Sequence, residues 1–146
     1  MSQRRIVAWG WGYEDQQPTP EQQQAIAKAV ATNLKASNVE VAKTPTIEDI
    51  TLRPPRVTPP ASLATICSSA PYDRIVHTYG KAFPDLVRAY RREFPNPPDV
   101  VAYPNTEADV VAVLDWCSQV NAAAIPFGGG SSVVGGTEAP ASEAYR

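Results

Sequence analysis

The sequence predicts an α+β fold: a strand–helix–strand unit close to the C-terminal end, preceded by a mostly helical and extended N-terminal region. Helix-start residues stand directly before apolar residues at helical spacing in segments 19–35 and 107–120. Prolines crowd the middle of the chain, where they exclude a helix or a central strand. Two short apolar segments, 99–104 and 122–128, flank the second helix and have the length of buried strands.

The bulk composition narrows the function classes. The chain has 146 residues, of which 43% are hydrophobic, so it can bury a core, and its formal net charge is −2. No basic stripe suggests nucleic acid as a partner, and no apolar stretch is long enough to cross a membrane. The N-terminal apolar run is too short for a secretory signal, so Cys67 and Cys117 are expected to be free thiols in a cytoplasmic protein.

Residues 5–13 predict an aromatic edge strand. Successive side chains of an extended chain point to opposite sides. The larger side chains would therefore share one face: Val7, Trp9, Trp11 and Tyr13. The other face would be nearly bare backbone, which suits close packing against a neighbouring element. We expect a strand clamped to the core and not a catalytic segment.

Residues 19–35 predict an amphipathic helix. Thr19 is the expected N-cap, Pro20 takes the first helical position, and Gln22 completes a capping box. The apolar residues that follow recur every four positions and form one stripe: Ile26, Val30 and Leu34. We expect this stripe to pack against the rest of the protein.

The middle of the chain combines an extended connector with two helices. Residues 44–71 are rich in proline and predict an extended surface connector. Residues 73–94 are helical in character, with Gly80 as a stop and Pro84 opening a second helix. The apolar residues of segment 73–94 are expected to face inward: Ile75, Val76, Tyr79, Leu86, Val87 and Tyr90.

This region also contains the charged residues that are candidates for a binding role. Arg88, Arg91 and Arg92 could together hold an anion, although a solvated helix face is the favoured interpretation. His77 has no cysteine or carboxylate at metal-ligand spacing, so no metal role is assigned to it.

Residues 98–128 predict the strand–helix–strand unit. Thr106 is an N-cap with Asp109 three residues later, and Cys117 falls on the apolar stripe as a core thiol. The other members of that stripe are Val110, Val113 and Leu114. A helix between two strands favours a right-handed crossover, so the strands are expected to be adjacent and parallel.

A glycine-rich loop, residues 128–136, follows directly. Glycines expose their amide N–H groups, and consecutive amides in a tight turn form a nest that attracts anions such as a diphosphate. Gly136 stands where a Walker A loop requires lysine, and Val133 where a dinucleotide fingerprint requires glycine. A flexible linker is disfavoured because the loop grows from an expected buried strand.

These residues carry a family resemblance. The pattern Pro-Asp-Val-Val at 98–101, Pro104, Ala-Asp-Val at 108–110 and Ile-Pro-Phe-Gly-Gly-Gly-Ser-Ser at 125–132 resembles the start of the FAD-binding domain of the vanillyl-alcohol oxidase / p-cresol methylhydroxylase (PCMH) superfamily. The resemblance implies a PCMH-type domain from 98 to 146, after an N-terminal region of residues 1–97. It implies an FAD site lined by Pro126, Phe127, Gly128, Gly129, Gly130, Ser131, Ser132, Gly135 and Gly136.

A narrower resemblance covers most of the remaining chain. The opening Trp-Gly-Trp-Gly-Tyr at 9–13 and segment 73–91 are similar to alkyldihydroxyacetonephosphate synthase-like flavoproteins. It implies that FAD either accepts a hydride or holds a substrate carbon during ether-bond formation. A small-molecule or lipid-precursor substrate, the catalytic residues and any homodimer contact would then involve chain beyond these residues, which are expected to be a fragment, a truncated frame or part of a split protein.

Two function classes stay open from the sequence. The chain is the FAD-binding portion of an oxidoreductase, either synthase-like or acting on alcohols or hydroxy acids, or it is a non-catalytic remnant that binds a partner. No histidine lies between Pro126 and Gly136, so FAD is expected to be held non-covalently. The 146 residues alone are expected to bind FAD weakly, because a cofactor pocket normally buries most of its ligand.

Overall fold

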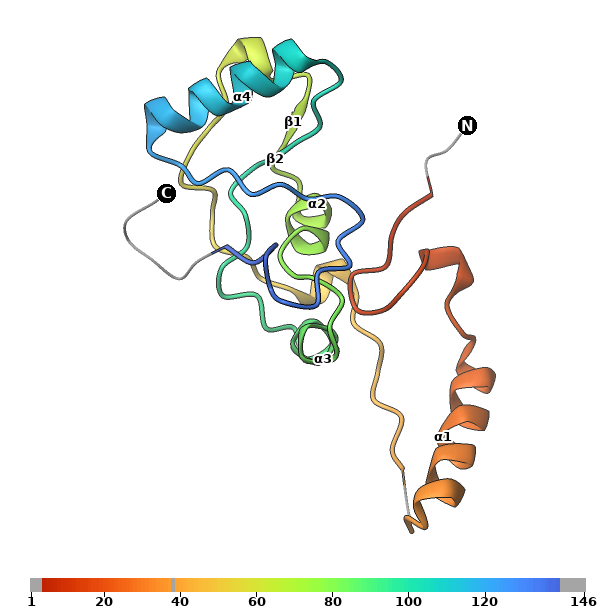
Figure 1. Cartoon of the computed structure of the whole chain (residues 1–146). Coiled ribbons are helices and arrows are strands. Elements are labelled where there is room, and N and C mark those ends of the chain that lie inside the picture. Colours follow the sequence, from red (N-terminus) through yellow and green to blue (C-terminus); the bar gives the residue numbers. More distant parts are fainter. Residues whose placement is uncertain (1–3, 38, 140–146) are drawn as a thin grey trace.

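The computed structural model describes residues 4–37 and 39–139, and it confirms the α+β class (Figure 1). Within these described ranges, four α-helices and two short strands are connected by loops and three single turns of 3-10 helix. The helices are α1 (Pro20–Leu34), α2 (Pro71–Val76), α3 (Phe83–Tyr90) and α4 (Glu107–Val120). The strands are β1 (Cys67–Ser68) and β2 (Val101–Ala102).

Helix α1 begins as the sequence predicts but does not pack as expected. The Thr19 side chain accepts from the Gln22 amide and the Gln22 side chain accepts from the Thr19 amide, so the capping box is formed. The expected packing of the stripe is wrong for the described residues, because Ile26, Val30 and Leu34 are 55%, 39% and 71% exposed. Figure 1 shows α1 lying apart from the other helices, and the buried residue of this helix is Ala27.

The expected aromatic strand at residues 5–13 is a tight hairpin instead. Ile6 and Tyr13 form an antiparallel bridge, and the Val7 amide donates to the Gly12 carbonyl over 3.1 Å. Gly12 has a φ of +82°, a left-handed conformation that glycine adopts at little cost. The glycines therefore turn the chain back on itself. Of the residues on the expected aromatic face, Val7 is buried, but Trp11 is 60% exposed.

The proline-rich connector is part of the core and not a surface link. Ile50 belongs to a cluster with Ile75, Tyr79 and Phe94, while Leu63 packs with Trp116 and Cys117 in a second cluster. Strand β1 also lies within the connector. Proline excludes regular helix over this stretch, yet it does not exclude burial, and the apolar residues between the prolines supply the buried surface.

The sheet differs from the expected parallel pair. Strand β2 pairs antiparallel with β1, with Cys67 opposite Ala102 and Ser68 opposite Val101. Among the described residues, segment 122–128 forms no strand, so the expected pairing with 99–104 is wrong. A strand needs a partner for its amide and carbonyl groups. Residues 66–68 fill that role for β2, and no described segment does so for 122–128.

Helix α4 confirms the predicted caps. Thr106 accepts from the Asp109 amide, and Asn121 ends the helix in the left-handed conformation at φ +53°. Its buried side is rotated from the expected stripe, because Trp116 and Cys117 are buried while Val110 and Leu114 are 43% and 49% exposed. Burial raises the pKa of the Cys117 thiol, which fits the predicted core thiol.

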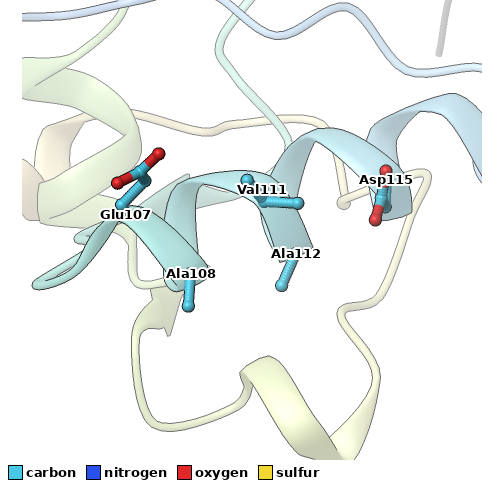
Figure 2. Close-up of a pocket in the computed structure, with 5 residues that line it drawn as sticks. All are labelled: Glu107, Ala108, Val111, Ala112 and Asp115. Atoms are coloured by element: carbon cyan, nitrogen blue, oxygen red, sulfur yellow. The ribbon is translucent and has the colours of Figure 1, made fainter.

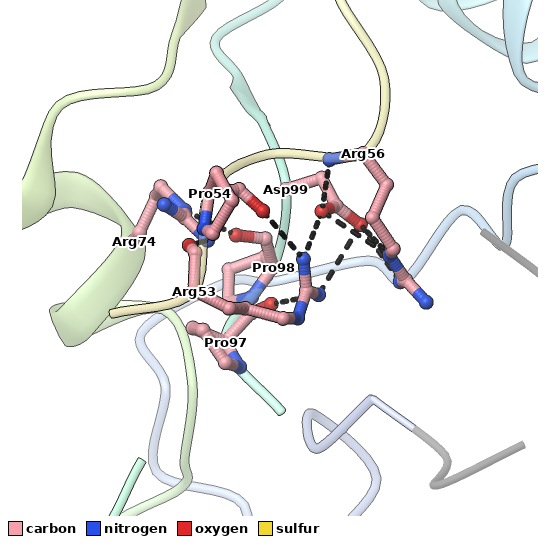
Figure 3. Close-up of polar contacts among 7 residues, drawn as sticks. All are labelled: Arg53, Pro54, Arg56, Arg74, Pro97, Pro98 and Asp99. Atoms are coloured by element: carbon pink, nitrogen blue, oxygen red, sulfur yellow. Dashed lines mark hydrogen bonds and ion pairs between the residues drawn. The ribbon is translucent and has the colours of Figure 1, made fainter. Parts of the chain in front are cut away.

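A buried polar network joins the connector to the segment before β2 (Figure 3). Asp99 accepts from both the Arg53 and Arg56 guanidinium groups, and from the Arg56 amide over 2.8 Å. Arg74 on α2 donates to the Pro98 carbonyl over 2.7 Å and to the Arg53 carbonyl over 2.9 Å. Burial by itself raises the pKa of Asp99, but hydrogen bonds from the two arginines outweigh it and hold that pKa well below its usual range.

Lys81 anchors the N-terminal hairpin. Its ammonium donates to the Val7 carbonyl over 2.8 Å and to the Ala8 carbonyl over 3.2 Å. Its side chain is buried, and no carboxylate within the described part of the chain forms a salt bridge with it. Desolvation therefore lowers the pKa of Lys81 to about 8.

The burial of Lys81 predicts that stability depends on pH. The folded chain releases this proton near pH 8, whereas an unfolded lysine keeps it until a pH of about 10.4. The unfolded state binds more protons in that window, so the Lys81 contribution to the free energy of unfolding should rise with pH. Urea titrations from pH 7.5 to 10.5 should show this rise in the wild type and not in Lys81→Met. Lys28→Met, at an exposed position on α1, should behave like the wild type.

Candidate functional site

The glycine-rich loop after α4 offers a run of free amide groups. Within the described residues, none of the backbone amides from Gly128 to Gly135 donates a hydrogen bond. A Cβ added at Gly128 or Gly129 would meet no atom within 4 Å, so the space above these two amides is open. Free N–H groups beside open space are suited to bind an anion, as the sequence predicts.

Two glycines fix the shape of this loop. Gly130 has a φ of +68°, and a Cβ there would collide with the Phe127 ring. Gly135 has a φ of +76° in the next turn. The turn is closed by the Gly136 amide, which donates to the Ser132 hydroxyl over 3.1 Å. Residues 127–136 therefore form tight turns that carry few bulky side chains.

The sequence-predicted site residues differ in exposure. Gly128, Gly129 and Ser131 are exposed, whereas Gly130 is buried under the Phe127 ring. Ser132 contributes its hydroxyl as an acceptor within the loop, so it stabilises the turn. In addition, the Thr137 hydroxyl is buried without a partner among the described residues. Thr137 was not among the predicted site residues, and its position one residue past the glycines is the signal that could have found it.

Residues from the N-terminal region support this loop, and the sequence did not reveal them. The His77 ring lies 4.4 Å from the Phe127 ring, measured between centroids, and 5.8 Å from the Tyr103 ring. Gly80 lies so close to the Ser132 carbonyl oxygen that a Cβ would overlap it. In Figure 1 the blue segment after α4 returns across α2 and α3, which agrees with both contacts. A contact between residues more than 45 positions apart has no local sequence signal.

Arg88 in α3 and Arg92 just after this helix do not form an anion site. Arg88 donates to Asp85 over 2.7 Å and to both Glu138 oxygens over 2.8 Å, and it covers the Tyr79 ring at 4.1 Å. Glu138, with Asp85, raises the pKa of Arg88 above its ordinary value. Arg92 reaches Asp49 over 3.3 Å. Arg88 and Arg92 therefore form ion pairs within the chain while their side chains stay about one third exposed, and Arg91 is exposed, as the interpretation of a solvated face expects.

No group of three histidine, cysteine or carboxylate side chains that could hold a metal ion gathers in residues 4–37 and 39–139. No helix in the described ranges is long and apolar enough to span a bilayer. A shallow hollow on α4, lined by Glu107, Ala108, Val111, Ala112 and Asp115, lacks a convergent polar constellation (Figure 2). The glycine-rich loop remains the candidate site.

Comparison with known protein families identifies the class of domain. Residues 98–143 match the family described as FAD binding domain. The matched stretch begins at Pro98 and includes α4 and the whole glycine-rich loop. FAD is therefore the cofactor that the match indicates, and the free amides of the loop fit its diphosphate without requiring a lysine.

The particular relatives are alkyldihydroxyacetonephosphate synthases. The Trypanosoma brucei brucei enzyme is 40% identical over 67 residues, and the Dictyostelium discoideum enzyme is 35% identical over 72 residues. These matches cover 46% and 49% of this chain, but only 11% and 12% of the relatives. Both relatives are enzymes by name.

Solved structures support the fold. Two crystal structures of alkyldihydroxyacetonephosphate synthase superpose with TM-scores of 0.74 and 0.72, at 24% and 23% identity. Each match covers 94% of this chain and 30% or 29% of the solved chain. The fold of this chain is therefore that of part of these solved structures, and this chain spans less than a third of their length.

Proposed function

We propose that this chain binds the diphosphate of FAD at residues 126–136, as part of an FAD-dependent enzyme that resembles alkyldihydroxyacetonephosphate synthase. The main observation behind this proposal is that, among the described residues, the amides from Gly128 to Gly135 donate no hydrogen bond. The space at Gly128 and Gly129 is also open. The family match over residues 98–143 supports FAD as the bound anion. The similarity to named synthases supports the choice of enzyme class.

Each part of the loop has a distinct role in this proposal. Gly128, Gly129 and Ser131 donate hydrogen bonds to diphosphate oxygens from exposed positions. Gly130 and Gly135 provide the two left-handed turns that keep the amides on one side. Pro126, Phe127, Ser132 and Gly136 shape the ends of the loop. FAD supplies the redox and carbon chemistry, while this chain contributes binding and orientation.

The class of enzyme can be tested by measuring which substrates the complete protein converts. The complete protein that carries this sequence should be assayed with acyl-dihydroxyacetone phosphate plus a fatty alcohol, and separately with 2-hydroxy acids and with alcohols. Formation of the alkyl product supports the synthase-like proposal. Turnover of hydroxy acids or alcohols without alkyl product would contradict it and assign the chain to a dehydrogenase or oxidase.

The flavin should be held non-covalently at this loop. His77 is the one histidine of the chain and lies beside Phe127, so it is the residue to consider as a tether. Its Nδ1 is 2.7 Å from the Asp73 carbonyl oxygen, to which only a protonated nitrogen can donate. Acid precipitation of the FAD-loaded protein should release all yellow colour into the supernatant. Colour retained in a pellet, and lost from His77→Gln, would contradict the prediction.

A further inference from the structure

The glycine-rich loop is supported by residues 77–88, which follow α2 and include most of α3. This support segment lies wholly before the stretch that matches the FAD binding domain family. It contacts Ser132 within the loop, and Phe127 and Glu138 on either side of the loop.

The central contact involves two backbones. Gly80 faces the Ser132 carbonyl with no room for a Cβ, and the Asp85 carboxylate closes the other side at 3.1 Å from that Cβ position. Gly80 itself has no left-handed φ, so its backbone conformation would accept alanine. The requirement for glycine here comes from the loop and not from the local turn.

The two outer contacts fix the ends of the loop. His77 packs against Phe127 with the two rings tilted by 53°, and its ring is oriented by the hydrogen bond from Nδ1 to the Asp73 carbonyl. Arg88 binds Glu138 through two hydrogen bonds of 2.8 Å, a bidentate geometry that restrains the position of the carboxylate. Because Arg88 is also bound to Asp85, one guanidinium connects α3 to the end of the loop.

We propose that Gly80 is a positioning residue for the FAD diphosphate, with His77 and Arg88 as its supports at the two ends of the loop. This inference rests on the proposed function, since it takes the loop to be the diphosphate site. The further inference is that the close approach of Gly80 to Ser132 sets the position of the free amides relative to the cofactor. A side chain at position 80 pushes Ser132 outward and moves the amides of Gly128 to Ser131 out of register with the diphosphate oxygens.

The test compares Gly80→Ala with Gly10→Ala in the complete protein. Gly10 also lacks a left-handed φ, and a Cβ there would meet only the flexible Gln17 side chain and Val7. FAD affinity from flavin fluorescence titration should fall at least tenfold in Gly80→Ala and stay unchanged in Gly10→Ala. Glu138→Gln, which weakens an outer contact, should reduce the affinity by a smaller factor.

Two further readouts separate positioning from a general loss of folding. The ³¹P NMR resonances of bound FAD should shift in Gly80→Ala and match the wild type in Gly10→Ala, because only the former displaces the diphosphate donors. In FAD-free protein, chymotrypsin should cleave after Phe127 faster in Gly80→Ala, since the displaced loop uncovers that ring.

The outcomes distinguish the inference from the proposed function. Wild-type affinity, phosphorus resonances and cleavage rate in Gly80→Ala would overturn the positioning role while leaving FAD binding intact. If the wild type bound no FAD, the proposed function would fail. Faster cleavage of Gly80→Ala would then still show that Gly80 positions the loop, but the link to the diphosphate would be rejected.

Discussion

Gly129→Asp is expected to abolish saturable FAD binding by the complete protein. The substitution places a carboxylate in the open space beside Gly129, where the proposal puts the negatively charged diphosphate. Like charges held about 4 Å apart repel by about 4 kcal/mol near a protein surface, which corresponds to roughly a thousandfold loss of affinity. Flavin fluorescence titration measures this loss directly.

Gly129→Ala is the matched control for this experiment. A Cβ at position 129 meets no atom within 4 Å and no left-handed φ is required there, so alanine should leave the fold unchanged. It adds bulk without charge, and FAD affinity should fall by much less than in Gly129→Asp. Equal affinity of Gly129→Asp and the wild type would show that the diphosphate lies elsewhere and would refute the site.

Local signals account for the parts of the fold that the sequence predicts correctly. The capping boxes at Thr19 and Thr106 each depend on residues three positions apart, so they are legible without knowledge of the fold. The Gly-Gly-Gly-Ser-Ser run is equally local, and it marks the loop whose amides prove to be free. The position of Cys117 on an apolar stripe is read from helical period alone.

The parts that were wrong depend on distant partners. Strand β2 pairs with residues 67–68 inside a proline-rich stretch that shows no strand pattern, so its partner could not be found from periodicity. The hairpin at residues 6–13 depends on Gly12 taking a positive φ, a choice that an alternating pattern does not reveal. Gly80 resembles an ordinary helix stop, and only its contact with Ser132 shows that the glycine-rich loop requires it.

The exposed side of α4 also shows that burial depends on distant parts of the chain. Val110 and Leu114 are at least 43% exposed, although the helical spacing predicts that both belong to the core stripe. The buried side is set by Leu63, which packs against Trp116 and Cys117. Helical period predicts that a helix has an apolar face, but which apolar side is buried depends on the elements present beside it.

Asp99→Asn should cause the largest loss of stability among substitutions outside the loop. Asp99 is 8% exposed and forms ion pairs with Arg53 and Arg56, two residues of the proline-rich connector. Asparagine keeps the shape but removes the charge, which leaves the two guanidinium groups without compensation beside the buried Arg74. Removing one partner of a buried pair costs about 3 to 5 kcal/mol, and the partial exposure of Arg56 places this case near about 3 kcal/mol.

The pH dependence identifies the charge as the cause. The folded-state pKa of Asp99 lies below its unfolded value, so the stabilisation is fully present above the unfolded pKa of about 3.9 and is lost as pH falls below it. Urea unfolding should therefore separate wild type from Asp99→Asn by a constant amount between pH 5 and 7, and the difference should shrink below pH 4. Asp15→Asn, which breaks the exposed pair with Arg4, should change stability little. A difference between wild type and Asp99→Asn that persisted undiminished to pH 2 would assign the loss to packing, because an ionic contribution must decrease once the unfolded state binds a proton that the folded state does not.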